Sequence, residues 1–141
     1  MVRLLVNIDV DDLEKAIEFY RSGLGLVLER RLFDGTVAEM IGGTSSIYLL
    51  EKAPGSLASA MASIRRDYRR HWTPVHLDVS VDNLAAAVQR ALDAGAVVEG
   101  DPQTHPWGRI AFMSDPFGHG FCLLEFSGQG YEAVTTSPAG R

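Results

Sequence analysis

The chain has few features that would tie it to an oxidising compartment, a membrane or a nucleic acid. Its 141 residues contain a single cysteine, Cys122, so no disulfide can form within the chain, and a reducing, cytoplasmic setting is expected. No apolar run approaches the roughly 20 residues of a membrane span, and the first residues lack the layout of a signal peptide. The net charge of −5 argues against a nucleic-acid binder and, more weakly, against binding to anionic membranes.

The chain also lacks the short motifs of familiar catalytic sites, such as Ser-x-x-Lys, Gly-x-Ser-x-Gly, His-Glu-x-x-His and the Walker phosphate loop. Its composition is that of an ordinary globular protein, with 46% hydrophobic and 22% charged residues. The length suffices for one compact domain with its own core. Function therefore has to be inferred from organisation and from a few polar residues.

The two halves of the chain repeat one order of elements. In the first half, the alternating segment 6–10 predicts a strand, and Asp11, with Glu14 three residues later, predicts the start of a helix that ends at Gly23. In the second half, 76–81 predicts a strand, and Asp82 or Asn83 caps a helix. Further strands are expected near 26–32, 36–42, 46–51, 96–100, 108–114 and 119–126. Each half reads β-α-β-β-β, which predicts an α+β fold of two tandem βαβββ modules.

These patterns also divide the chain. We expect a first module at 1–54, a linker helix at 55–72, a second module at 73–127 and a flexible tail at 128–141 rich in Gly, Ser, Thr and Pro. Ser56 is the predicted cap of the linker helix, and the basic end of that helix is interpreted as a solvated face.

Three segments together resemble the vicinal-oxygen-chelate superfamily, which includes glyoxalase I, extradiol dioxygenases and bleomycin-binding resistance proteins. They are the strand-helix motif at 10–26, its counterpart at 76–96, and the Asp-Pro-Phe-Gly hairpin with its last strand at 115–125. The resemblance covers roughly residues 3–127. It implies cupped, barrel-like mixed sheets with the helices outside, a small-molecule site on the concave side, and pairing of chains as homodimers.

The resemblance also implies four positions for metal ligands, one on each of four strands. The preferred register places them at Leu5, Tyr48, His76 and Cys122, of which only His76 is a usual ligand. A second register would pair Asn7 with His76, but it needs a two-residue insertion before the helix. We therefore expect no metal cofactor. The alternative is an atypical site in which His76 and Cys122 bind a divalent ion such as Zn, Fe, Ni or Mn.

Strand alternation predicts which residues face the concave side. His76 and Asp78 share one face of their strand, and a four-residue turn at 115–118 would place Ala111 opposite Cys122. Glu51 and Glu125 are expected to face away from it. Trp107 is expected to border the pocket, Trp72 to be a structural anchor, His71 and His105 to be exposed, and His119 to be structural. The predicted ligand-binding residues are Asn7, Tyr48, His76, Asp78, Trp107, Arg109, Met113 and Cys122.

The preferred hypothesis is a metal-free protein that binds a hydrophobic or aromatic small molecule, as in sequestration of an antibiotic. The alternatives are an enzyme of the same superfamily (a lyase, isomerase, epimerase or dioxygenase), either metal-free with His76 as the base or with an atypical metal. The sequence leaves open whether the protein is an enzyme, although it favours binding over catalysis.

Overall fold

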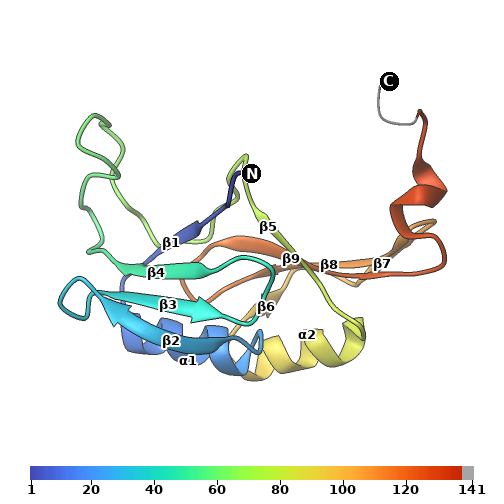
Figure 1. Ribbon diagram of the computed structural model, residues 1–141, viewed down its shortest axis with the longest axis horizontal. Helices are drawn as coiled ribbons and strands as arrows, with labels where there is room; N and C mark the ends of the chain where they lie inside the picture. The colour runs from blue at the N-terminus through green and yellow to red at the C-terminus, as the bar shows by residue number, and fades with distance from the viewer. Residues whose placement is uncertain (138–141) are drawn as a thin grey trace.

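The computed structural model describes residues 1–137 and shows two sheets with one helix each on the same side (Figure 1). The first sheet has the order β1-β4-β3-β2, with β1 parallel to β4 and the remaining pairs antiparallel. Its elements are β1 (Val6–Val10), α1 (Leu13–Ser22), β2 (Val27–Leu32), β3 (Val37–Ile41) and β4 (Ile47–Glu51).

The second sheet repeats this topology in the order β5-β9-β8-β6, with β5 parallel to β9. Its elements are β5 (Leu77–Ser80), α2 (Leu84–Asp93), β6 (Val97–Val98), β7 (Gln103–His105), β8 (Gly108–Ser114) and β9 (Gly120–Phe126). The predicted α+β class and the two βαβββ modules are confirmed, and the cupped sheets do not close into a barrel within residues 1–137. The short strand β7, which pairs with β8, was not predicted.

Equivalent residues cap the two helices. The Asp12 side chain accepts a hydrogen bond from the backbone N–H of Lys15, and Asn83 accepts one from Ala86, both at 3.0 Å. The predicted cap at Asp11 was therefore one residue early. Because Leu5 lies seven residues before Asp12 and His76 lies seven before Asn83, the preferred match of Leu5 with His76 is confirmed.

In each module, a glutamate near the end of the last strand adds a second cap to the helix. Glu51, at the end of β4, accepts from the backbone N–H of Leu13 at 3.3 Å, and Glu125, in β9, accepts from Leu84 at 2.8 Å. A carboxylate at a helix N-terminus also complements the helix dipole. Both glutamates thus face the helices, as predicted, and are not available to the concave side.

One apolar core joins the two modules. Phe19 of α1 meets Phe121 of β9 at a ring distance of 6.4 Å, and both belong to the same buried cluster as Met113 and Leu84. The buried Tyr20 hydroxyl donates a hydrogen bond of 2.7 Å to Asp115 of the second module. The modules therefore pair within the chain.

The predicted linker helix is wrong, because residues 55–72 form turns and bends with two isolated bridges, one between Leu57 and Arg65 and one between His71 and His119. A short helix in this segment would be stable only if its apolar side chains packed against the rest of the protein. Two of those side chains, Met61 and Ile64, are instead 97% and 72% exposed. Instead, the Arg66 guanidinium binds the Asp9 carboxylate at 2.7 Å and backbone carbonyls of the linker itself. These contacts hold the linker in an irregular conformation.

The segment predicted to be a flexible tail contains a 3-10 helix, Gly130–Val134. Tyr131 packs on Phe126 with a ring distance of 4.7 Å and on Trp107 at 5.5 Å. Residues 138–141 lie outside the described residues. No helix in residues 1–137 is long and apolar enough to cross a membrane.

Candidate functional site

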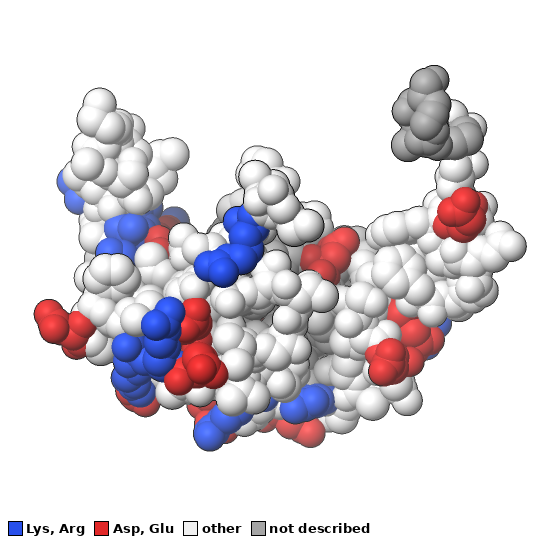
Figure 2. Space-filling model, viewed as in Figure 1, with Lys and Arg blue, Asp and Glu red and all other residues white. Residues whose placement is uncertain are grey.

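On the side of the molecule away from the helices, the 55–65 lobe, the N-terminal segment and the C-terminal 3-10 helix project, and the surface is hollowed between these projections (Figure 1 and Figure 2). The turn between β8 and β9 sets which residues reach this side. It contains five residues, 115–119, because Asp115 Oδ1 accepts from the backbone N–H groups of both Phe117, at 2.8 Å, and His119, at 2.9 Å. The predicted four-residue turn was one residue too short. Phe112 therefore pairs with Cys122, and Ala111 pairs with Leu123.

A shift of one residue turns every side chain of a strand to the other face. Arg109 and Met113, both predicted to line the pocket, consequently face the helix side, where Met113 is fully buried in the core that joins the modules. Ile110 and Phe112 take their places on the concave face. We call the concave face of the second sheet the cup; its residues are His76, Asp78, Ile110, Phe112, Cys122 and Leu124.

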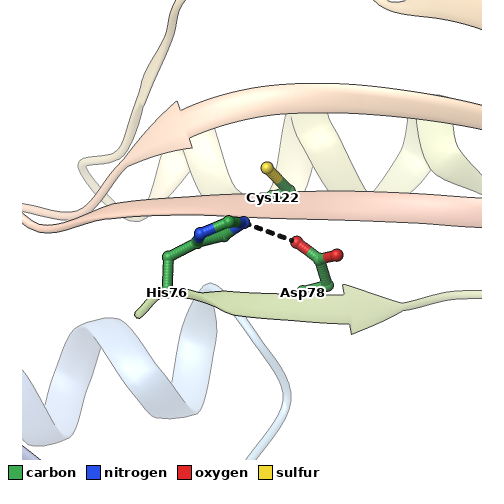
Figure 3. A group of neighbouring side chains, drawn as sticks. All are labelled: His76, Asp78 and Cys122. Carbon is green, nitrogen blue, oxygen red and sulfur yellow. Dashed lines mark ion pairs between the residues drawn. The ribbon is translucent and has the colours of Figure 1, made fainter. Parts of the chain in front are cut away.

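Three residues of the cup form a polar cluster: His76, Asp78 and Cys122 (Figure 3). His76 Nε2 lies 3.3 Å from Asp78 Oδ1, and Asp78 pairs across the strands with Cys122. The His76 and Asp78 side chains are 38% and 41% exposed, so both can reach a ligand. The two side chains thus lie in contact although they are only two residues apart on one strand.

Cys122 forms the floor of this cluster. Burial, the charge of Asp78 and a hydrogen bond with Asp78 raise the pKa of the Cys122 thiol from 9.0 to about 12, with burial the largest cause. The thiol is thus protonated at neutral pH and behaves as a small apolar group with a weak donor. It is therefore not a ready nucleophile.

Aromatic side chains flank the polar cluster. The Trp72 ring lies edge-on to His76, with a centroid distance of 5.4 Å, and to Phe112 at 6.0 Å. It is 42% exposed, so part of its surface is open to a ligand. Arg70 covers the ring at 4.7 Å, which agrees with the predicted anchoring role. The sequence reasoning missed that Trp72 also lines the site.

Trp107 closes the other end of the cup. It packs on Ile110, Cys122 and Leu124 and stacks on His105, with ring centroids 5.3 Å apart and planes within 8°. These contacts place Trp107 next to the cup, and its role at the edge of a ligand pocket stays a prediction. His105 also lies 3.1 Å from the Gln103 side chain.

A cleft of about 330 Å³ runs between the modules. It brings together Asn7 of β1 and His76, which lie in different halves of the sequence. The wall also includes His71, His119 and Asp115, which the sequence reasoning had placed in solvent or in a structural turn. No local pattern in the sequence identified them, because His71 reaches the cleft only through the irregular path of the linker. We call this space the intermodule cleft.

Tyr48 lies on the concave face of the first sheet, beside a smaller hollow of about 250 Å³ that Asn7 also lines. Its hydroxyl donates to Glu39 at 2.5 Å, and Arg30 donates to the same carboxylate at 2.6 Å. The hydrogen bond with Glu39, followed by burial, raises the pKa of Tyr48, so the phenol stays neutral. Glu39 was missed, although the strand pairing places it directly opposite Tyr48.

The residues at the four inherited ligand positions do not fit the metal site of the superfamily. Leu5 has no donor atom, Tyr48 is held as a neutral phenol, and the Cys122 thiol resists ionisation. Only His76 is a strong ligand at these positions.

The topology and the concave site define a protein of the glyoxalase and bleomycin-resistance architecture. The chain belongs to the glyoxalase-like domain family, whose model matches residues 5–124. The superfamily inferred from the sequence motifs is thereby confirmed.

The chain is 30% identical over 120 residues to the anthracycline biosynthesis protein DauV of Streptomyces sp. strain C5, covering 85% of this chain and 40% of that protein. It is 28% identical over 129 residues to DnrV of Streptomyces peucetius, also an anthracycline biosynthesis protein, covering 92% and 42%. The chain thus spans about two fifths of the length of these relatives. Among solved structures, TnmS3, an antibiotic-binding protein from Streptomyces sp. CB03234, superposes with a TM-score of 0.64 at 27% identity over 90% of this chain and 97% of that one.

Proposed function

We propose that the protein binds a hydrophobic or aromatic small molecule in the cup and the adjoining intermodule cleft, without a resident metal, and that it acts by sequestration. The observation that carries this proposal is the aromatic wall of Trp72 and Phe112 around the polar pair of His76 and Asp78. Apolar surfaces with a few oriented polar groups are typical of small-molecule sites. A volume of about 330 Å³ in the cleft alone suits part of a multi-ring compound.

The contacts suggest how such a ligand lies. Arg70 covers one face of the Trp72 ring and Gly120 lies close to the ring, so a flat ring system would contact the exposed part of Trp72 together with Phe112. His76 and Asp78 can then hydrogen-bond hydroxyl or amino groups at the edge of the ring system. The net charge of −5 favours a cationic substituent through long-range attraction.

The comparisons support antibiotics as the ligand class. One structural relative at 27% identity is an antibiotic-binding protein, and two sequence relatives belong to anthracycline biosynthesis. An anthracycline is therefore a suitable first probe. It is planar, aromatic and cationic, so it tests each of the three contacts proposed above.

The test is a titration of wild-type protein with an anthracycline, followed by tryptophan fluorescence. We expect saturable quenching that weakens at least tenfold in His76→Ala, because the substitution removes the polar group from the wall of the site. Arg109→Ala is the matched control, since Arg109 lies on the same sheet but faces the helices. Equal loss in both variants, or no saturable quenching in the wild type, would contradict the proposal.

A metal-free enzyme is a second candidate, favoured by the 3.3 Å contact between His76 and Asp78. That contact orients the imidazole as a carboxylate orients a general base. A pH–rate profile with a limb from a general base in the wild type, and without that limb in His76→Ala, would support this function over simple binding.

An atypical metal enzyme would have to use the three donors of the polar cluster, whose ligand atoms lie within 4.8 Å of one another. Near-stoichiometric Zn, Fe, Ni or Mn in protein purified without chelators would favour it, and background metal would argue against it. The homodimer implied by the family resemblance stays a prediction, which sedimentation of the purified chain can check.

A further inference from the structure

His71 and His119 form a histidine pair where the linker, β1 and the turn between β8 and β9 meet. The pair lines the intermodule cleft but lies outside the polar cluster. His71 Nε2 and His119 Nδ1 are 2.8 Å apart. At the outer ends of the pair, His71 Nδ1 lies 2.7 Å from the carbonyl oxygen of Arg69, and His119 Nε2 lies 2.7 Å from that of Asp9.

The protons in this chain of contacts can be counted. Carbonyl oxygens only accept hydrogen bonds, so each outer nitrogen must carry a proton. Two neutral imidazoles have one N–H each, and both would then be used at the outer ends. The inner nitrogens would face each other at 2.8 Å with two lone pairs, which is repulsive. One additional proton converts this contact into a third hydrogen bond.

We propose that the histidine pair binds one shared proton and thus forms a singly charged, proton-dependent clasp between the linker and the first module. The clasp spans the cleft wall, since His71 belongs to the linker, His119 to the second module and the Asp9 carbonyl to β1. A backbone hydrogen bond also joins the linker to the turn between β8 and β9, because the N–H of His71 donates to the carbonyl oxygen of Gly118 at 2.8 Å. Loss of the proton removes the central bond of the chain and loosens this edge of the cleft.

The carboxylates around the pair favour the added charge. The carboxylate of Asp115 accepts the backbone N–H of His119 at 2.9 Å and otherwise binds the neutral donors Tyr20 and Phe117. Within residues 1–137, none of the groups that donate a hydrogen bond to the Asp115 carboxylate is a cation, so these bonds do not neutralise its negative charge.

The neighbouring cations are each matched by a carboxylate. Arg66 binds Asp9, and Arg69 binds Asp67, both at 2.7 Å, while Arg70 binds Glu99. Tyr68 packs edge-on to His119 at 6.2 Å, and burial, with the charge of Asp9, raises the pKa of Tyr68 to about 12, so its phenol is neutral there. The charge of Asp115 also acts on Arg70, whose main partner is Glu99, so the shared proton adds to a partial balance of the Asp115 charge.

Nitrogen-15 NMR of the histidine rings in wild-type protein at neutral pH tests the proposal directly. The outer nitrogens are protonated with or without the extra proton, so the inner pair decides the outcome. A shared proton moves both inner nitrogens of His71 and His119 away from the shift of a nitrogen without a proton. Two inner nitrogens that both retain the unprotonated shift at neutral pH would overturn the proposal. Neither result depends on ligand binding, so the proposal can fail independently of the proposed function.

Stability provides a second readout. Above about pH 7 the folded pair holds its shared proton while the unfolded histidines are neutral, so the stabilisation is lost as the pH rises further. The stability advantage of wild type over His119→Gln should therefore shrink between about pH 7 and about pH 9. The His105→Gln control should show no such trend, since the Gln103 amide can accept or donate. A constant advantage across this range would overturn the proposal.

Discussion

Cys122 allows the electrostatics of the cup to be tested without knowledge of the ligand. It is the only cysteine, so every thiol reaction reports on this position. With a pKa of about 12 in place of 9.0, about one thiol in ten thousand is ionised at pH 8, against about one in ten for an ordinary cysteine. Ionisation alone should thus slow the reaction of the native thiol with a disulfide reagent about a thousandfold relative to the unfolded chain.

The same shift predicts a pH-dependent stability. The pKa is higher in the folded state, so the folded protein holds this proton more tightly, and the stabilisation is lost as the pH rises from about 9 towards about 12. By pH 10 the wild type should lose about 1.4 kcal/mol of unfolding free energy through this group. Cys122→Ala lacks the thiol, so the stability difference between the two proteins should change by that amount between pH 7 and pH 10.

Denaturant unfolding of both proteins at the two pH values measures this change, and other titrating groups cancel because both chains contain them. Asp78→Asn offers a further check. It removes the second and third causes of the shift but leaves burial, so native reactivity should rise while remaining below that of the unfolded chain. A stability difference that is constant from pH 7 to pH 10, together with a fast native reaction, would refute the reasoning.

Three further substitutions test the scaffold of the site. Tyr20→Phe removes a buried hydrogen bond to Asp115, and denaturant unfolding should show a loss of about 1.5–3 kcal/mol; a loss below 0.5 would contradict the anchoring role. Glu125→Ala removes a cap of α2 and should cost about 0.5–2 kcal/mol by the same measurement, whereas an unchanged stability would argue against the cap. Gly120→Ala would place a Cβ 2.5 Å from the Trp72 ring, so it should cost about 1–3 kcal/mol and alter tryptophan emission; an unchanged spectrum would show that the ring is not held there.

Periodicity and turn chemistry were sufficient to predict the repeated modules. The caps at Asp12 and Asn83 lie within one residue of the predicted starts, and the elements of both halves follow one another in the predicted order, with the short β7 added in the second. Such local signals act within a few residues, which is why a single sequence contains them. The failed linker helix shows the limit. Its apolar spacing was helical, but the conformation is set by a long-range pair between Arg66 and Asp9 that no local pattern reveals.

The site was predicted in part, for a related reason. His76, Asp78 and Cys122 meet as strand alternation implied, and Asn7 and Trp107 lie at the edges of the same concave region. Arg109 and Met113 were misplaced because one extra residue in the turn at 115–119 inverts the whole of β8. That length follows from a buried Asp115 that bonds two backbone N–H groups, and it depends on tertiary packing around Tyr20.

The most direct test of the central claim is an anthracycline titration of chelator-treated protein, with the metal content of the same sample determined by elemental analysis. We expect saturable quenching of tryptophan fluorescence at background metal, with an affinity that added Zn²⁺ or Mn²⁺ does not change. Binding that appears only after a divalent ion is restored would contradict the metal-free site. No saturable binding under either condition would contradict the assignment of this ligand class.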